Sequence, residues 1–169
     1  MLVGSPRYAI DKLQCVLNAA ARLFSGTRKF DRGLSRLLHD DLHWLDIPER
    51  VQFKLGVIVH RCLQGSAPHY LADSCTLVSE VASRQRLRSA SRRQLLIPQQ
   101  LLSTFGRRAF SVAGPTVWNS LPVEIRDTAS STEQFSTEQF RRLLQTFFVQ
   151  RIRGFYDYAL YKFIIYIYI

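Results

Sequence analysis

The chain has 169 residues, of which 47% are hydrophobic and 21% are charged. It is therefore long enough to bury the core of one domain, and its composition argues against global disorder. The formal net charge is +10, with 19 arginines against 4 lysines, and because guanidinium groups bind phosphate oxygens bidentately this excess indicates an anionic polymer as partner. A solvated surface with arginine-rich codon usage would produce the same composition.

The N-terminal half is predicted to be helical. Apolar residues recur at three- and four-residue steps across residues 8–25, and Gly26 supplies a helix stop. Leucines at steps of three and one across residues 34–38 indicate a short second helix, for which Asp31 is the expected N-cap.

A third helix is predicted to begin at Pro48, because the N–H that proline lacks has no partner in the first turn of a helix. It would end at Gly65, and Pro68 would start a further single turn. The apolar residues expected to form the buried stripe of the third helix are Val51, Leu55, Ile58, Val59, Cys62 and Leu63.

The character of the chain changes at about Ser74. Residues 79–93 are polar and rich in arginine, with no apolar period, which predicts a loop or linker. The apolar run at residues 95–97, before Pro98, predicts a short strand, and residues 108–112 predict a second one. We expect these two strands to pair as a small β-hairpin.

A short helix and a long one are predicted beyond the hairpin. Gly114-Pro115 should break the chain and start the short helix, which Pro122 would close. The long helix is expected to begin at Ser130 or Ser131, each of which has an acid or amide three residues later, as in a capping box. A tandem repeat lies at this entry, Ser131-Thr132-Glu133-Gln134-Phe135 followed by Ser136-Thr137-Glu138-Gln139-Phe140, and only one of its two phenylalanines need be buried.

These elements predict a mainly α fold, namely a single helical domain with a small β-hairpin in its C-terminal half. The predicted organisation is an N-terminal extension (1–7), the domain (8–150) and an Ile/Tyr-rich tail (151–169). Within the domain we expect a helical part (8–73), an arginine-rich linker (79–93) and a hairpin plus helix (94–150).

The arginine-rich stretch is the candidate binding site. Alternation would place Arg84, Arg86 and Arg88 on one side of an extended strand, where they could follow a phosphate backbone. The full set of candidate nucleic-acid-binding residues is Arg84, Arg86, Arg88, Arg92, Arg93, Arg107 and Arg108, the last two joining if the hairpin folds back. A solvated linker is the alternative interpretation.

No complete catalytic or metal-binding constellation is present, so we expect no enzyme activity and no cofactor. Asp40-Asp41 follows Leu38-His39 at the end of a helical pattern, whereas paired metal-binding carboxylates of a polymerase require a tight strand turn. The histidines and cysteines lack the paired spacing of a zinc site. Trp44 and Trp118 could stack on bases, but each adjoins leucine and a proline turn, which favours a core position.

The cysteines and the ends of the chain suggest a location. Cys15, Cys62 and Cys75 have no paired spacing, which favours a reducing compartment over a disulfide scaffold, and the two on predicted helices are expected to be small core residues. The first eight residues do not read as a secretory signal. The uncharged run after Lys162 has 7 residues, too few to span a bilayer, so a cytoplasmic or nuclear protein is expected. For the tail we favour a read-through extension or non-native end over an added edge strand.

Four segments in order carry a resemblance to a known family. The most informative is Phe105–Pro122, which contains Gly114-Pro115-Thr116-Val117-Trp118-Asn119-Ser120-Leu121-Pro122. The others are Leu13–Leu23, Leu42–Lys54 and Gly65–Leu71. Together, over roughly residues 8–150, they resemble the C-terminal region of reverse transcriptases encoded by non-LTR (LINE-type) retrotransposons, downstream of the polymerase core.

The resemblance implies a part of an RNA-directed DNA polymerase without its catalytic carboxylates. The function we expect is that of a non-catalytic fragment that contacts RNA or DNA without sequence preference through its arginines. A structural or protein-interaction segment is the alternative, as is a translated relic with no retained activity. Arginines clustered on one face would favour nucleic acid, and scattered ones the structural interpretation. No small-molecule substrate is expected, and the sequence does not specify an oligomeric state.

Overall fold

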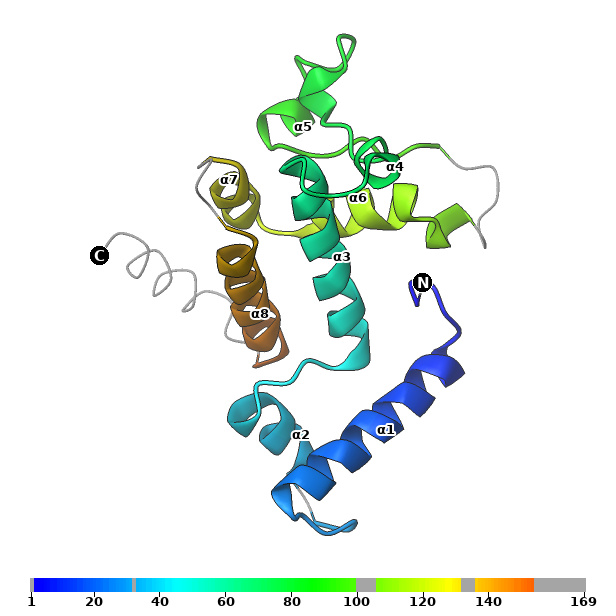
Figure 1. Ribbon diagram of the computed structural model, residues 1–169, viewed down its shortest axis with the longest axis vertical. Coiled ribbons are helices and arrows are strands. Elements are labelled where there is room, and N and C mark those ends of the chain that lie inside the picture. The colour runs from blue at the N-terminus through cyan, green and yellow to red at the C-terminus, as the bar shows by residue number, and fades with distance from the viewer. Residues whose placement is uncertain (1, 32, 100–105, 132–135, 154–169) are drawn as a thin grey trace, which may run out of the picture. The chain divides into compact units, whose positions relative to one another are not determined.

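The computed structural model describes residues 2–31, 33–99, 106–131 and 136–153, and these residues are mainly helical (Figure 1). The α-helices are α1 (Arg7–Ser25), α2 (Leu34–Arg36), α3 (Ile47–Leu63), α4 (His69–Ala72), α5 (Arg88–Ser91), α6 (Phe110–Ser120), α7 (Val123–Ser131) and α8 (Thr137–Arg153). A π-helical turn, η1 (Leu37–Asp41), follows α2, and two 3-10 turns are η2 (Val78–Glu80) and η3 (Gly106–Arg108). The mainly α prediction is confirmed.

The chain forms two compact units. The first comprises residues 51–144 together with the residues before Ser5, and the second comprises Ser5–Arg50 together with the residues from Gln145. Each unit is described separately below. In both, no described helix combines the length and the apolar character needed to cross a membrane.

In the second unit, α1 matches its predicted bounds closely. Gly26 ends it in the left-handed conformation (φ +69°), which a glycine adopts without steric cost. The N-cap prediction for the next helix is wrong, because Gly33 precedes α2 and the Asp31 carboxylate instead accepts a hydrogen bond from the Arg28 N–H (2.9 Å). The acid thus closes its own turn before α2 begins.

A polar network connects α1 to the segment before α3. The Gln14 side chain donates to Asp46 Oδ1 (2.7 Å) and accepts from the Ile47 N–H (3.0 Å). His39 Nε2 lies 3.5 Å from Asp46 Oδ2, and His39 Nδ1 lies 2.9 Å from the Trp44 carbonyl oxygen. Segments 13–23 and 42–54 therefore meet here. Their side chains hold the backbone at Ile47, and His39 holds the backbone at Trp44.

The core of the first unit forms around α3. Of the predicted stripe, Leu55, Val59 and Cys62 are buried, whereas Val51, Ile58 and Leu63 are half-buried. Gly56 lies so close to Leu144 that a Cβ on it would come within 2.9 Å of the leucine Cδ2. The absent side chain of Gly56 thus allows α8 to approach α3 closely at Leu144.

Aromatic rings complete this core. The His60 ring stacks on Phe140 with centroids 4.1 Å apart and planes at 5°, and Trp118 lies 6.0 Å from Phe140. Trp118, Phe140 and Leu144 are fully buried. The expected core position of Trp118 agrees with this packing.

The predicted β-hairpin is wrong. Within the described residues no strand forms, and the only ladder contact is an isolated antiparallel bridge between Leu77 and Leu95. Residues 108–112 belong instead to the end of η3 and the start of α6, and Val112, Ala113 and Trp118 are buried on different sides of α6. These side chains are buried within the first unit, whereas an isolated two-stranded hairpin would be marginal in water.

Gly114-Pro115 does not break the chain, because Pro115 lies inside α6. The absent side chain of Gly114 allows close packing here, since a Cβ there would lie 3.1 Å from both Val59 and Phe110. Pro115 has a φ angle that suits a helix, but it lacks the N–H that would bind the Ser111 carbonyl oxygen, and its ring crowds that carbonyl group. The motif therefore serves close helix packing.

The last helix begins later than predicted. α8 starts at Thr137, and not at Ser130 or Ser131, which belong to α7. Ser136 Oγ accepts a hydrogen bond from the Gln139 N–H (3.2 Å), and Gln139 Oε1 accepts one from the Ser136 N–H (2.8 Å). This reciprocal pair is a capping box built from the second copy of the tandem repeat.

Candidate nucleic-acid interface

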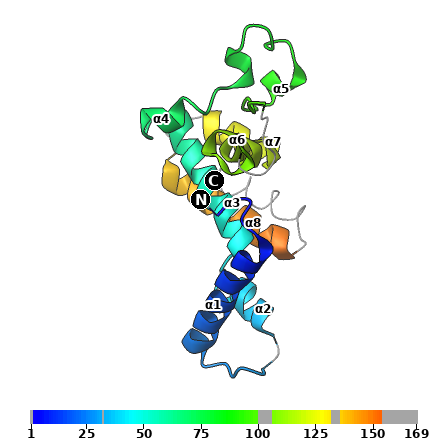
Figure 2. The same cartoon turned by 90° about the vertical axis from the view of Figure 1, so that its right-hand side faces the viewer.

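Residues 78–94 form a loop that is closed at its base, which we call the arginine loop. The Val78 N–H donates to the Gln94 carbonyl oxygen (2.9 Å), and the Leu96 N–H donates to the Thr76 carbonyl oxygen (2.8 Å). These bonds flank the Leu77–Leu95 bridge. Figures 1 and 2 show the loop, which carries α5, beyond the C-terminal end of α3.

Successive turns build the arginine loop, so the predicted extended alternation of arginines is wrong. Hydrogen bonds join residues three apart, from Arg84 N–H to Val81 O (2.8 Å), from Leu87 N–H to Arg84 O (3.1 Å) and from Ala90 N–H to Leu87 O (3.0 Å). Ala90 is the buried residue of α5, and it holds the turns to the unit. The exposed arginines of this loop therefore lie on successive turns and not on an extended strand.

Two side chains of α6 fix the base of the loop. The Trp118 indole N–H donates to the Arg93 carbonyl oxygen (3.1 Å). The Asn119 amide binds both backbone groups of Leu95, accepting from its N–H and donating to its carbonyl oxygen, each at 2.8 Å. Asn119 thereby acts as a substitute for a neighbouring β-strand.

Arg93 has a positive φ of +49°, which is uncommon for a residue with a side chain. The Trp118 hydrogen bond holds the carbonyl group of this same residue. Sequence patterns identified Trp118 as a core residue, but they gave no signal for its second contact or for the role of Asn119.

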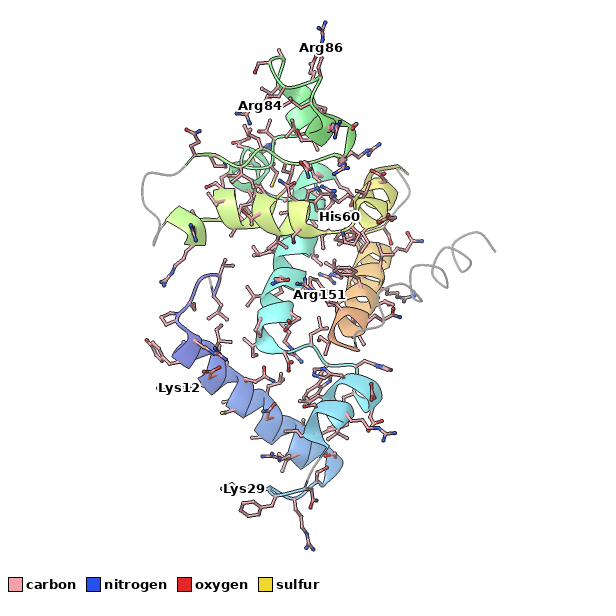
Figure 3. All side chains as sticks on the ribbon, turned by 180° about the vertical axis from the view of Figure 1, so that it is seen from behind. Lys12, Lys29, His60, Arg84, Arg86 and Arg151 are labelled. Carbon is pink, nitrogen blue, oxygen red and sulfur yellow. The ribbon has the colours of Figure 1, made fainter. Side chains whose placement is uncertain are left out.

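The predicted binding residues fall into two groups. Arg84, Arg86, Arg88 and Arg92 are exposed on the arginine loop, and Arg93 is half-buried at its base. Figure 3 shows the side chains of Arg84 and Arg86 projecting outward from the loop. Arg107 and Arg108 lie on η3, with the Arg108 side chain next to Gly4. Because no hairpin forms among the described residues, the expected folding of Arg107 and Arg108 back onto the loop through a hairpin is not seen there.

A buried arginine that the sequence analysis missed lies behind the loop. Arg126 on α7 is only 2% exposed. Burial lowers the pKa of its guanidinium, Asp127 opposes that effect, and the positive charge of Arg92 adds to it. Arg92 is thus close enough for its field to act on Arg126, and a buried cation adds to the positive potential at this part of the loop.

The other candidate sites have ordinary structural contacts. In the described parts of the chain, no group of three or more His, Cys, Asp or Glu side chains is arranged to hold a metal ion. Asp40 lies in η1, 3.9 Å from Arg36 of the same exposed helical segment. The Arg50 guanidinium lies over one face of the half-buried Trp44 ring at 5.6 Å, and Trp118 is fully buried.

The three cysteines divide by exposure. Cys62 and Cys75 are buried and their thiols are hydrogen-bonded to each other, whereas Cys15 is exposed, contrary to the prediction of a core position. Burial raises the pKa of Cys62, and burial together with the neighbouring Cys62 raises that of Cys75 to about 12.

We expect an aromatic disulfide reagent to label Cys15 rapidly in the native protein and Cys62 and Cys75 only after unfolding. At about pH 8 a thiol of pKa about 12 is roughly one part in ten thousand thiolate, and the thiolate is the reactive form. Stopped-flow absorbance would measure the two phases. The Cys15→Ser variant should lose the fast phase and keep the slow one. A fast phase that persists in this variant would contradict the burial of Cys62 and Cys75.

No family model, curated protein or solved structure matches the chain.

Proposed function

We propose that the chain is a non-catalytic C-terminal segment of a non-LTR retrotransposon reverse transcriptase, and that it contacts RNA or DNA without sequence preference through the arginine loop. The observation that carries the proposal is the presentation of Arg84, Arg86, Arg88 and Arg92 on one closed loop. Clustering of cations on one surface is what a phosphate backbone requires.

The design of the loop supports this role. Its base is fixed by Trp118 and Asn119, while the arginine side chains are exposed. A fixed base with exposed, charged side chains suits a polyanion whose phosphates differ in spacing from site to site. Guanidinium groups also stack on bases, which adds affinity without sequence readout.

The proposal assigns no catalytic step to this chain. The residues of the family-like segments that the structure describes, among them Gln14, Asp46, Trp118 and Asn119, make hydrogen bonds to backbone or to one another. These are the contacts of a scaffold. Polymerase chemistry would be supplied by the part of the enzyme that precedes this region.

We expect affinity for single-stranded RNA or DNA to depend weakly on sequence and to fall steeply with salt. Each neutralised phosphate on a single strand contributes about −0.7 to the slope of log affinity against log salt. Replacing Arg84, Arg86 and Arg88 with glutamine should therefore flatten the slope by about 2 units without changing base preference. Fluorescence anisotropy across a salt series would measure both.

A matched control separates the loop from net charge. Lys54, Arg61 and Arg141 are exposed cations elsewhere in the same unit, and their replacement by glutamine removes the same charge. This control should leave the slope close to that of the parent protein. Equal flattening in both variants, or no binding at low salt, would favour the structural or relic interpretation over nucleic-acid binding.

A further inference from the structure

Two serines lie among the arginines of the arginine loop, and both have the same arginine spacing before them. Ser91 follows Arg88 by three residues and Arg86 by five. Ser89 follows Arg86 by three residues and Arg84 by five. No other serine or threonine of the chain has arginine at both of these positions. Arginine-directed protein kinases select serines by this pattern, because acidic side chains in the kinase groove pair with the upstream guanidinium groups.

The structure distinguishes the two hydroxyl groups. Ser91 is exposed at the end of α5, whereas Ser89 is half-buried near its start. The Ser91 hydroxyl donates a hydrogen bond to the Arg88 carbonyl oxygen (2.9 Å). Ser91 is thus the accessible acceptor, and it lies between two exposed arginines, Arg88 one turn before it and Arg92 next to it.

We propose that Ser91 is a phosphorylation site for an arginine-directed kinase, and that its phosphate pairs with Arg88 and Arg92. In the reaction, Ser91 Oγ bonds to the γ-phosphorus of ATP, the bond from that phosphorus to the β–γ bridging oxygen breaks, and ADP leaves. The hydroxyl proton passes to the catalytic aspartate of the kinase. The product carries a charge of about −1.5 to −2 at neutral pH. Its oxygens accept bidentate hydrogen bonds from guanidinium groups.

The arginine loop can deliver this serine to a kinase without opening its base. A kinase groove holds its substrate extended, so residues 84–91 must straighten. This breaks the turn hydrogen bonds donated by the Leu87 and Ala90 N–H groups, and it exposes Ala90, which has little apolar area. The hydrogen bonds that Trp118 and Asn119 make to the base lie outside this segment and persist. The opening is therefore local.

The phosphate weakens the arginine loop as a ligand for polyanions, a consequence that rests on the proposed function. Residues 78–94 contain five arginines and one glutamate, which gives a formal charge of +4. The phosphate lowers that charge to about +2 and occupies the two arginines nearest to it. The buried cation Arg126 lies within the field of Arg92 and further favours a dianion at this place.

Incubation of the full chain with MgATP and a purified kinase that requires arginine at both positions tests the site. Intact mass and peptide mapping should show one phosphate, at Ser91. Ser91→Ala should remove it with unchanged circular dichroism, because the side chain is exposed, and Ser89→Ala should retain it. Ser25 is exposed but has only one upstream arginine, Arg22, and should remain unmodified. No incorporation, incorporation at Ser89 in place of Ser91, or equal incorporation at Ser25 would overturn the proposal.

Phosphorus NMR titration of the phosphorylated chain tests the pairing without a nucleic acid. Guanidinium groups stabilise the dianion, so the second pKa of the phosphate should lie below its ordinary value of about 6. Arg92→Gln, which leaves the upstream arginines intact, should raise this pKa. Arg61→Gln, at an exposed arginine elsewhere in the same unit, should leave it unchanged. An ordinary pKa in the parent chain, or no effect of Arg92→Gln, would contradict the pairing.

Fluorescence anisotropy with a single strand distinguishes this inference from the proposed function. Because the phosphate offsets about two cations, it should flatten the slope of log affinity against log salt by about 1.4 units. Equal slopes for the two forms would overturn the regulation of binding. If neither form binds at low salt, the proposed function fails and the regulation fails with it, whereas the mass and NMR results still decide whether Ser91 is the modification site.

Discussion

Replacing Trp118 with alanine is expected to lower the free energy of unfolding by about 3–5 kcal/mol, as is typical when a buried aromatic side chain is removed. Trp118 is fully buried, it lies 6.0 Å from the Phe140 ring, and its indole N–H binds the Arg93 carbonyl oxygen. The change therefore leaves both a cavity in the core and an unsatisfied carbonyl group at the base of the arginine loop.

Trp118→Phe separates these two effects. Phenylalanine fills most of the cavity but has no donor for Arg93, and leaving a buried acceptor unsatisfied costs about 1–3 kcal/mol. Chemical denaturation would measure the stability of both variants. Hydrogen exchange at Val78 and Leu95, whose N–H groups bond at the base of the loop, would report local opening.

Trp44→Ala tests whether the loss of either tryptophan would destabilise the protein and open the arginine loop to the same extent. Trp44 is half-buried and lies in the second unit, so Trp44→Ala should cost less and leave exchange in the loop unchanged. An unchanged denaturation midpoint for Trp118→Ala would refute the core assignment. Fast exchange at Val78 and Leu95 in the parent protein would refute the closed loop.

Helices whose ends are defined by nearby residues were predictable from the sequence. α1 has an apolar period and a glycine stop, α3 has a proline in its first turn, and α4 follows Pro68. In each case a residue near the helix end satisfies or removes backbone groups, so no distant contact is needed to define the boundary. The π-helical turn after α2 had no such signal.

Elements that depend on distant contacts were not predictable. Residues 108–112 were predicted to form a short strand, yet they lie in η3 and the start of α6, where Gly114 allows Val59 of α3 to approach. The start of α8 was ambiguous because the repeat offers the same capping box twice. Sequence alone gave no reason to prefer one copy.

In the candidate site, too, local features were predictable and features set by distant contacts were not. Arginine content identified the loop, whereas its shape depends on Asn119, a residue 24 positions from Leu95. The buried Arg126 is likewise positioned by α7, which the sequence did not predict. Charge is a local property of the sequence and was found, but the direction in which it is presented is set by tertiary contacts.

Phe140→Ala is expected to destabilise the protein by about 3–5 kcal/mol, because Phe140 is fully buried and stacks on His60 at 4.1 Å while lying 6.0 Å from Trp118. It therefore connects α3, α6 and α8 within one unit. Thermal and urea denaturation would measure the loss. Phe140→Leu should cost less, because leucine keeps much of the apolar volume.

The tandem repeat supplies an internal control for this prediction. Phe135 ends the first copy as Phe140 ends the second, and it lies outside the described residues. Since Ser136 and Gln139 of the second copy form the capping box and Phe140 is in the core, Phe135→Ala should cost much less than Phe140→Ala. Equally small losses of stability in the two single variants would mean that either copy of the repeat can begin α8. In that case either phenylalanine would be able to occupy the core. In that case Phe140→Ala alone would be only mildly destabilising, and removal of both rings would be required to unfold the domain.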